Sequence, residues 1–138
     1  MEIVARTEAE TEALGARLFA ALDPPATVLL DAPMGAGKTA LARGFLRAGG
    51  VAGEVPSPTY ALVQPYDTAK GAVFHLDLYR VEAPSELEEL GLDDMTEAGI
   101  VLVEWPARAG GALTGDVRVS GRIAEDGARV WSVDGVSL

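Results

Sequence analysis

Apolar and polar positions near the start of the chain recur with the period of a helix. Leucines are spaced four apart along residues 7–22, so that they form one stripe. Thr7, with Glu10 three positions later, has the pattern of a capping box and predicts that the helix begins there. A short apolar run over residues 27–31 follows, and such a run is typical of a fully buried strand.

Further helices and strands are expected to alternate along the chain. A second helix is predicted from Lys38 to the glycine pair at positions 49 and 50. Strands are predicted over residues 60–63 and 72–79. A short helix is expected next, with Ser85 as its N-cap and Glu88 closing a second capping box.

The last third of the chain predicts one more buried strand and a hairpin. Residues 100–103 are an uninterrupted apolar run, rich in β-branched side chains. Alternating valines on both sides of Asp126 and Gly127 predict a C-terminal β-hairpin that turns at these two residues. Buried strands that alternate with helices indicate an α/β fold with a mixed, mostly parallel sheet.

The loop between the first buried strand and the second helix has the composition of a phosphate-binding loop. Glycines let its backbone approach an anion closely, a lysine attracts the β and γ phosphates, and a threonine hydroxyl can bind magnesium. The residues are Gly35, Ala36, Gly37, Lys38 and Thr39. Because a strand precedes this loop and a helix follows it, we expect a P-loop NTPase with helices flanking the sheet, as a single domain over residues 1–138.

One position departs from the usual P-loop pattern, which has glycine where this chain has Ala32. Pro33 follows, and a residue before proline is pushed toward extended geometry with negative φ, which alanine tolerates. Proline also has no N–H, so the loop is expected to offer one donor fewer to a phosphate.

A P-loop enzyme needs an acid at the carboxyl end of a neighbouring strand to hold magnesium, directly or through water. Glu104 follows four apolar residues and is the first candidate. Asp77 is the second, because His75 interrupts the apolar run before it. Strand alternation places His75, Asp77 and Tyr79 on one face, so Asp77 is expected to be a catalytic or supporting acid.

Four other residues have two interpretations each. His75, the only histidine, is either a base or a buried structural residue. Arg80 either stabilises phosphate charge or pairs with nearby acids. Ser57 and Thr59 lie in a loop that either senses the γ phosphate, as switch loops do, or forms a proline turn before a strand.

Composition narrows the possible functions. The net charge of −10 repels a nucleic-acid backbone, so tight direct binding of RNA or DNA is not expected. Seven acids between positions 82 and 97 form either a docking face for a basic partner or, as we expect, a solvated face. The chain has no cysteine, no leader-like start and no apolar run near the roughly 18 residues of a membrane span. We therefore expect a soluble, cytoplasmic protein that does not bind a membrane.

Four segments together resemble the TsaE (YjeE) family in order and spacing. The P-loop segment alone is shared by very many proteins, whereas the segments that begin at His75 and at Glu104 are far more specific in so short a chain. The likeness spans roughly residues 7–120. The segments are Gly35-Ala36-Gly37-Lys38-Thr39, Ser57-Pro58-Thr59-Tyr60, His75-Leu76-Asp77-Leu78-Tyr79-Arg80 and Glu104-Trp105-Pro106.

The resemblance implies a bacterial ATPase that supports formation of N6-threonylcarbamoyladenosine (t6A) in tRNA. Members of the family bind a complex of the TsaD and TsaB proteins, and their hydrolysis of ATP with Mg²⁺ sustains turnover of that complex. Such a protein would meet tRNA only indirectly, through that complex. Family members usually carry glycine at position 32 and an acid at position 33.

The resemblance also implies roles for residues. Thr39 and Glu104 would ligate magnesium, and the loop from Gly35 to Ala40 would wrap the phosphates. Hydrolysis would need Asp77, together with the lysine of the loop and the metal acid. Thr59 is the hydroxyl expected to contact the nucleotide from the switch-like loop, and the adenine would lie near residues 8–11.

Two other functions fit the same residues. A small-molecule P-loop kinase shares the loop, although 138 residues leave little room for an acceptor site and a lid. A nucleotide-responsive binding module with little hydrolysis is the other alternative, and the sequence does not separate it from an ATPase. A regulatory GTPase is disfavoured, because the usual guanine-reading motif needs asparagine and the chain has none.

Overall fold

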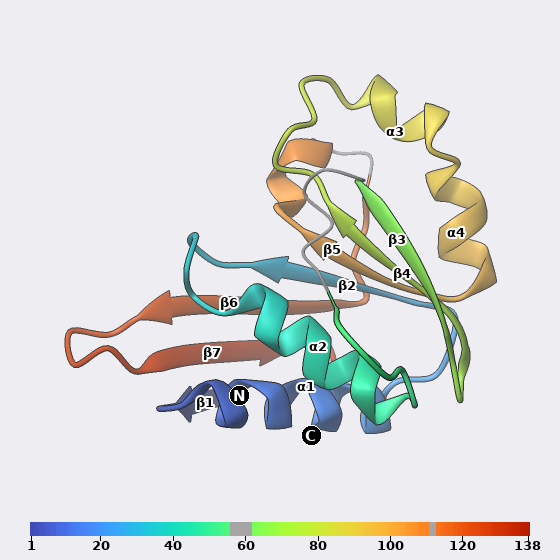
Figure 1. The fold of residues 1–138 in the computed structure, drawn as a ribbon. Helices are drawn as coiled ribbons and strands as arrows, with labels where there is room; N and C mark the ends of the chain where they lie inside the picture. The colour runs from blue at the N-terminus through green and yellow to red at the C-terminus, as the bar shows by residue number, and fades with distance from the viewer. Residues whose placement is uncertain (56–61, 111–112) are drawn as a thin grey trace.

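The fold is built on one mixed sheet. A computed structural model describes residues 1–55, 62–110 and 113–138. These residues form seven strands in the order β1-β7-β6-β2-β5-β4-β3 (Figure 1). The four central strands β6, β2, β5 and β4 run parallel, whereas β1, β7 and β3 pair antiparallel at the two sides. The strands are β1 (Glu2–Ala5), β2 (Ala26–Asp31), β3 (Val63–Thr68), β4 (Gly71–Asp77), β5 (Ile100–Glu104), β6 (Val117–Ile123) and β7 (Arg129–Asp134).

Helices cover the sheet on both faces, as Figure 1 shows. Residues of α1 and α2 share one buried cluster with Val28, Leu30 and Leu102, while α3 and α4 share a second cluster with Leu29 and Val103. Neighbouring residues of a strand thus point to opposite cores, as the pleat requires. None of the described helices combines the length and apolar character needed to cross a membrane. The helices are α1 (Glu8–Ala21), α2 (Lys38–Ala48), α3 (Ser85–Glu89), α4 (Leu92–Ala98) and the short η1 (Pro106–Ala109).

The predicted architecture is confirmed: an α/β fold with a mixed, mostly parallel sheet, flanking helices and a C-terminal β-hairpin. The first helix begins as expected, because the Thr7 hydroxyl accepts the N–H of Glu10 at 3.1 Å. In a capping box the Glu10 carboxylate would accept the N–H of Thr7. Here it accepts the N–H of Arg6 instead.

Several boundaries differ from the prediction. Strand β1 was missed because four residues carry too little alternation to be distinguished from a loop. The strand expected over residues 60–63 begins at Val63 and continues to Thr68, while residues 60 and 61 lie outside the described part of the chain. Its Pro65 fits there because β3 is an edge strand, where a missing N–H costs no ladder bond.

The short helix predicted near Ser85 is present, but the capping predicted for it was wrong. Pro84 is the N-cap of α3 and Ser85 is its first helical residue. The Glu86 carboxylate, rather than a serine hydroxyl, accepts the N–H groups of Glu82 and Ala83 at 2.7 and 3.0 Å. Helix α4 was also missed, because its seven residues follow a glycine and have too few apolar positions to form a stripe.

Helices α1 and α2 approach each other closely at two glycines. A Cβ added to Gly15 would lie 2.1 Å from the Leu41 carbonyl oxygen, and one added to Gly44 would lie 1.9 Å from that of Glu12. Both values are far below van der Waals contact with backbone atoms, which cannot move aside as a side chain can. This contact sets the position of α2 and therefore of the loop that precedes it.

Exchange of Gly15 for alanine tests this contact. Helix propensity alone would raise the free energy of unfolding by about 1 kcal/mol, whereas the clash with α2 is expected to lower it by about 1–3 kcal/mol. Chemical denaturation of Gly15→Ala measures the sign. The reverse exchange at exposed Ala13, Ala13→Gly, reports the propensity effect alone, and a stabilised Gly15→Ala variant would contradict the close approach.

Candidate functional site

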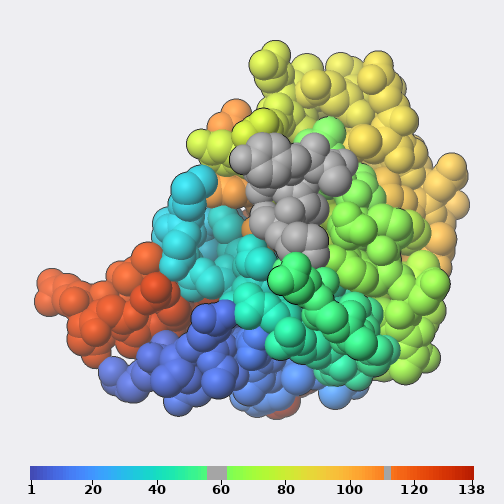
Figure 2. Space-filling model, in the orientation of Figure 1, coloured from blue at the N-terminus to red at the C-terminus, as the bar shows by residue number. Residues whose placement is uncertain are grey.

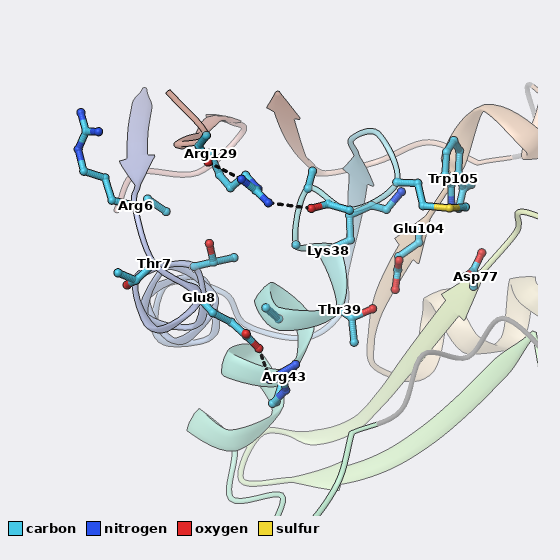
Figure 3. Close-up of a pocket in the computed structure, with 18 residues that line it drawn as sticks. Arg6, Thr7, Glu8, Lys38, Thr39, Arg43, Asp77, Glu104, Trp105 and Arg129 are labelled. Carbon is cyan, nitrogen blue, oxygen red and sulfur yellow. Dashed lines mark hydrogen bonds and ion pairs between the residues drawn. The ribbon is translucent and has the colours of Figure 1, made fainter. Parts of the chain in front are cut away.

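A cavity of about 490 Å³ opens at the carboxyl ends of the central strands. Figure 3 shows its walls: the loop before α2, the start of α1, the ends of β4 and β5, and the tip of the β6–β7 hairpin. All but one of the predicted site residues line it. They are Gly35, Ala36, Gly37, Lys38, Thr39, Ala40, Asp77 and Glu104. Thr59 lies outside the described residues, as does Ser57.

Strand pairing brings the two acids beside the loop. In the parallel register, Glu104 of β5 is opposite Leu30 of β2 on one side and opposite Asp77 of β4 on the other. Parallel strands end at the same edge of a sheet, so acids at these positions meet the loop that leaves β2. Glu104 is only 2% exposed and Asp77 only 3%, which keeps both carboxylates away from bulk water.

The loop has the backbone geometry expected of an anion cradle. Gly35 and Gly37 have φ values of 83° and 106°, in the left-handed region that L side chains rarely adopt. Gly37 is the N-cap of α2, so the N–H groups of the first helical turn have no partner within the helix. Ala32 is not among the described non-glycine residues with positive φ, which agrees with the negative φ predicted for the residue before Pro33.

Lys38 lies against the loop and against an aromatic ring. Its Nζ donates to the Ala32 carbonyl at 2.7 Å and sits 3.7 Å from the centroid of the Trp105 ring. Burial lowers the pKa of Lys38, and the negative charges of Glu104, Asp77 and Asp31 oppose that shift. These carboxylates favour the charged ammonium at a buried position beside the loop.

Glu104 is fixed from behind by His75. The Nε2 atom of His75 lies 2.6 Å from Oε2 of Glu104, and the histidine is fully buried. With the proton on Nε2, the imidazole donates to the carboxylate, and Nδ1 has no hydrogen-bond partner among the described residues. His75 is not among the described residues that line the cavity, so this contact with Glu104 is made behind the cavity wall.

Asp77, Tyr79 and Arg80 lie at different positions relative to the cavity. Asp77 lines the cavity, and its Oδ1 accepts the N–H of Tyr79 at 2.9 Å, which holds the carboxylate at the strand end. Tyr79 lies beyond the end of β4, and its ring packs on Trp105 with 5.1 Å between centroids. Arg80 is exposed in the turn after β4 and is not among the described residues that line the cavity.

Two arginines that line the cavity, Arg43 and Arg129, were not predicted as site residues. Arg129, at the start of β7, donates from Nη2 to the Gly35 carbonyl at 3.1 Å. Arg43 of α2 pairs with Glu8 of α1 at 2.7 Å and with Glu12 at 3.1 Å. No local pattern marks these arginines, because the fold brings Arg129 to a residue 94 positions earlier.

The hydroxyl of Thr39 and the carboxylate of Glu104 are the kinds of ligand that suit a magnesium ion bound together with a phosphate group. Both line the same cavity, and Mg²⁺ is usually held by one or two carboxylates together with phosphate oxygens and waters. Within the described residues no group of three or more histidine or acid side chains forms a complete metal cage. A site of this kind suits a metal that arrives with a phosphate ligand.

Comparison with known proteins identifies the family. Residues 5–130 match the sequence model of the family described as threonylcarbamoyl adenosine biosynthesis protein TsaE. The chain belongs to the TsaE family.

Named relatives agree with this assignment. The Haemophilus influenzae protein named tRNA threonylcarbamoyladenosine biosynthesis protein TsaE is 45% identical over 87 residues, which are 62% of this chain and 55% of that protein. The Rickettsia prowazekii protein of the same name is 34% identical over 121 residues, 86% of this chain and 84% of its own length. In several TsaE relatives the matched part is only 55–61% of the relative's length.

A solved structure has the same fold. The crystal structure of Bacillus subtilis YdiB superposes with a TM-score of 0.80 at 25% identity, over 96% of this chain and 83% of that chain. The shared fold therefore extends over nearly the whole chain.

A double-mutant cycle tests the buried contact between His75 and Glu104. Removal of either partner, in His75→Phe or Glu104→Leu, leaves the other polar group buried without its partner and is expected to cost about 3–5 kcal/mol of unfolding free energy. The double variant is expected to cost less than the sum by more than about 1 kcal/mol, because neither group is then left unpaired. Urea denaturation measures the cycle, and additive effects would contradict the contact.

Proposed function

We propose that residues 1–138 form a single ATPase domain that binds ATP with Mg²⁺ and hydrolyses it to support t6A formation in tRNA. The observation that carries the proposal is the glycine cradle at Gly35 and Gly37 beside two buried acids at adjacent strand ends. This combination provides phosphate binding and metal binding in one cavity.

The loop is the proposed phosphate site. The backbone N–H groups from Gly35 to Ala40 surround the phosphates, and Lys38 contributes positive charge toward the β and γ groups. Nζ of Lys38 now bonds to a neutral carbonyl, a weaker acceptor than a phosphate oxygen. A phosphate therefore competes favourably for this ammonium.

Thr39 and Glu104 are the proposed magnesium ligands. When bound, Mg²⁺ neutralises charge that develops on the phosphate oxygens during transfer. His75 occupies one oxygen of Glu104, which leaves the other oxygen for the metal or for one of its waters. His75 thus fixes the direction of the ligand, while the hydroxyl of Thr39 approaches from the first turn of α2.

Asp77 is the proposed acid that hydrolysis needs. Its backbone bond from Tyr79 holds the carboxylate at the cavity wall one strand away from Glu104. A carboxylate in this position can orient a water molecule and accept its proton as it attacks. Loss of Asp77 is therefore expected to reduce turnover more than nucleotide affinity.

The biological role rests on the family. The relatives are named for t6A biosynthesis, and the TsaE family model matches residues 5–130 of this chain. We infer that the partner is a complex of TsaD and TsaB in the cytoplasm, and that tRNA is met only through it. The net charge of −10 supports an indirect role, since this chain would repel tRNA.

The test is ATP hydrolysis with and without the TsaD–TsaB pair. Wild-type activity is expected to rise when the pair is added. Lys38→Ala and Glu104→Ala are each expected to lower kcat by about 100-fold or more, because each removes a charged group next to the reacting phosphates. Asp67→Asn, an exposed acid on the edge strand β3, is the control and should change kcat by less than about twofold.

Two outcomes would contradict this function. Transfer of phosphate to a small acceptor would favour a P-loop kinase. Nucleotide binding with no hydrolysis under any condition, including single turnover with TsaD and TsaB, would favour the nucleotide-responsive binding module.

Thr39 offers a separate test of the metal site. Thr39→Ser keeps the hydroxyl and Thr39→Val keeps the shape without it. We expect Thr39→Ser to retain Mg²⁺-dependent ATP affinity, and Thr39→Val to lose about tenfold when Mg²⁺ is present but little when EDTA removes it. Titration calorimetry in both buffers measures the difference, and an equal loss in both would show that the hydroxyl is not a metal ligand.

A further inference from the structure

The charge on the cavity wall is opposite to that of the whole chain. The protein has 11 basic and 21 acidic residues, yet four basic residues line this cavity against three acidic ones. The basic residues are Arg6, Lys38, Arg43 and Arg129. A local excess of positive charge in an acidic protein marks the part of the surface that attracts anions.

Two of these four side chains are already neutralised by carboxylates. Arg43 pairs with Glu8 at 2.7 Å, and Arg6 pairs with Asp126 at 2.9 Å. Lys38 and Arg129 differ, because within the described ranges no carboxylate lies within ion-pair distance of either. Among the described residues, Lys38 and Arg129 are therefore the two lining cations without an ion-pair partner, and they are the ones available to an anion.

Lys38 and Arg129 hold the same loop from two sides. Lys38 donates to the Ala32 carbonyl at 2.7 Å, while Arg129 donates to the Gly35 carbonyl at 3.1 Å and also to that of Gly127. Figure 3 shows the guanidinium of Arg129 reaching the loop from the hairpin, and Lys38 on the side of Glu104 and Trp105. A guanidinium has five N–H donors, so two carbonyls leave others available.

Arg129 is the first residue of β7 and lies on a hairpin that projects from the rest of the domain. Figure 2 shows the β6–β7 hairpin projecting past the remaining surface, next to the N-terminal segment. The ion pair between Arg6 and Asp126 joins the hairpin tip to the end of β1, and β1 pairs along β7. Gly127 and Arg129 of this hairpin line the cavity.

We propose that Arg129 is a phosphate-binding residue: it holds the loop through the Gly35 carbonyl and donates to a phosphate group of the nucleotide from the hairpin side. This inference rests on the proposed function. It also accounts for the proline at position 33, since a guanidinium can supply N–H donors where the loop has one fewer.

Binding of ATP and of adenosine to matched variants tests this role. Arg129→Ala is expected to weaken ATP binding roughly 10- to 100-fold, which corresponds to the loss of hydrogen bonds to a charged group. Adenosine, which has no phosphate, is expected to bind both proteins with nearly equal Kd. Arg129→Lys, which keeps the charge but not the fork of donors, is expected to lie between wild type and Arg129→Ala.

The control is Arg122→Ala. Arg122 is exposed on β6 of the same hairpin, opposite Val130, and is not among the described residues that line the cavity. Its removal therefore changes the net charge by the same amount as Arg129→Ala but leaves the loop untouched. Its ATP affinity is expected to stay within about twofold of wild type. Thermal unfolding without nucleotide checks that each variant is folded.

The outcomes separate this inference from the proposed function. Equal ATP affinity of wild type and Arg129→Ala would overturn the role of Arg129 and leave the ATPase proposal intact. Equal losses for ATP and adenosine would also overturn it, because Arg129 would then act on the nucleoside part of the ligand and not on its phosphates. Failure of the wild type to bind ATP at all would overturn the proposed function and this inference with it.

Discussion

The parallel pairing of β2 with β5 and of β5 with β4 is the constraint on which the site depends. Because all three strands end at one edge of the sheet, the loop that leaves β2 faces the last residues of the other two. Glu104 and Asp77 are register neighbours there. A shift of β5 by one residue would turn Glu104 toward the opposite core and remove it from the cavity.

This arrangement requires charged groups to be buried, which is costly unless each has a partner. Glu104 has the imidazole of His75, Asp77 has the N–H of Tyr79, and Lys38 has the carbonyl of Ala32. Stability must come from elsewhere in the molecule. It is supplied by apolar layers on both faces of the sheet, and by the close contact of α1 with α2 that permits no side chain at Gly15 or Gly44.

The sequence predicted those parts whose signals are local. Uninterrupted apolar runs identified β2 and β5, and the glycines and Lys38 identified the loop. The acids at the ends of β5 and β4 identified Glu104 and Asp77. Features that depend on distant contacts were missed. Strand β1 exists because β7 pairs with it, and Arg129 joins the cavity only because the hairpin packs beside the loop, so neither has a signal of its own.

The cavity joins segments from nearly the whole chain. The loop is closed on one side by Arg129, whose contact with Gly35 spans 94 positions, and β1 finds its only described partner strand in β7. Contacts of such long range form late in folding, because the intervening chain must first be ordered. During synthesis the loop and its helix emerge long before the hairpin. A nascent chain therefore cannot have the complete cavity until its last two strands have left the ribosome.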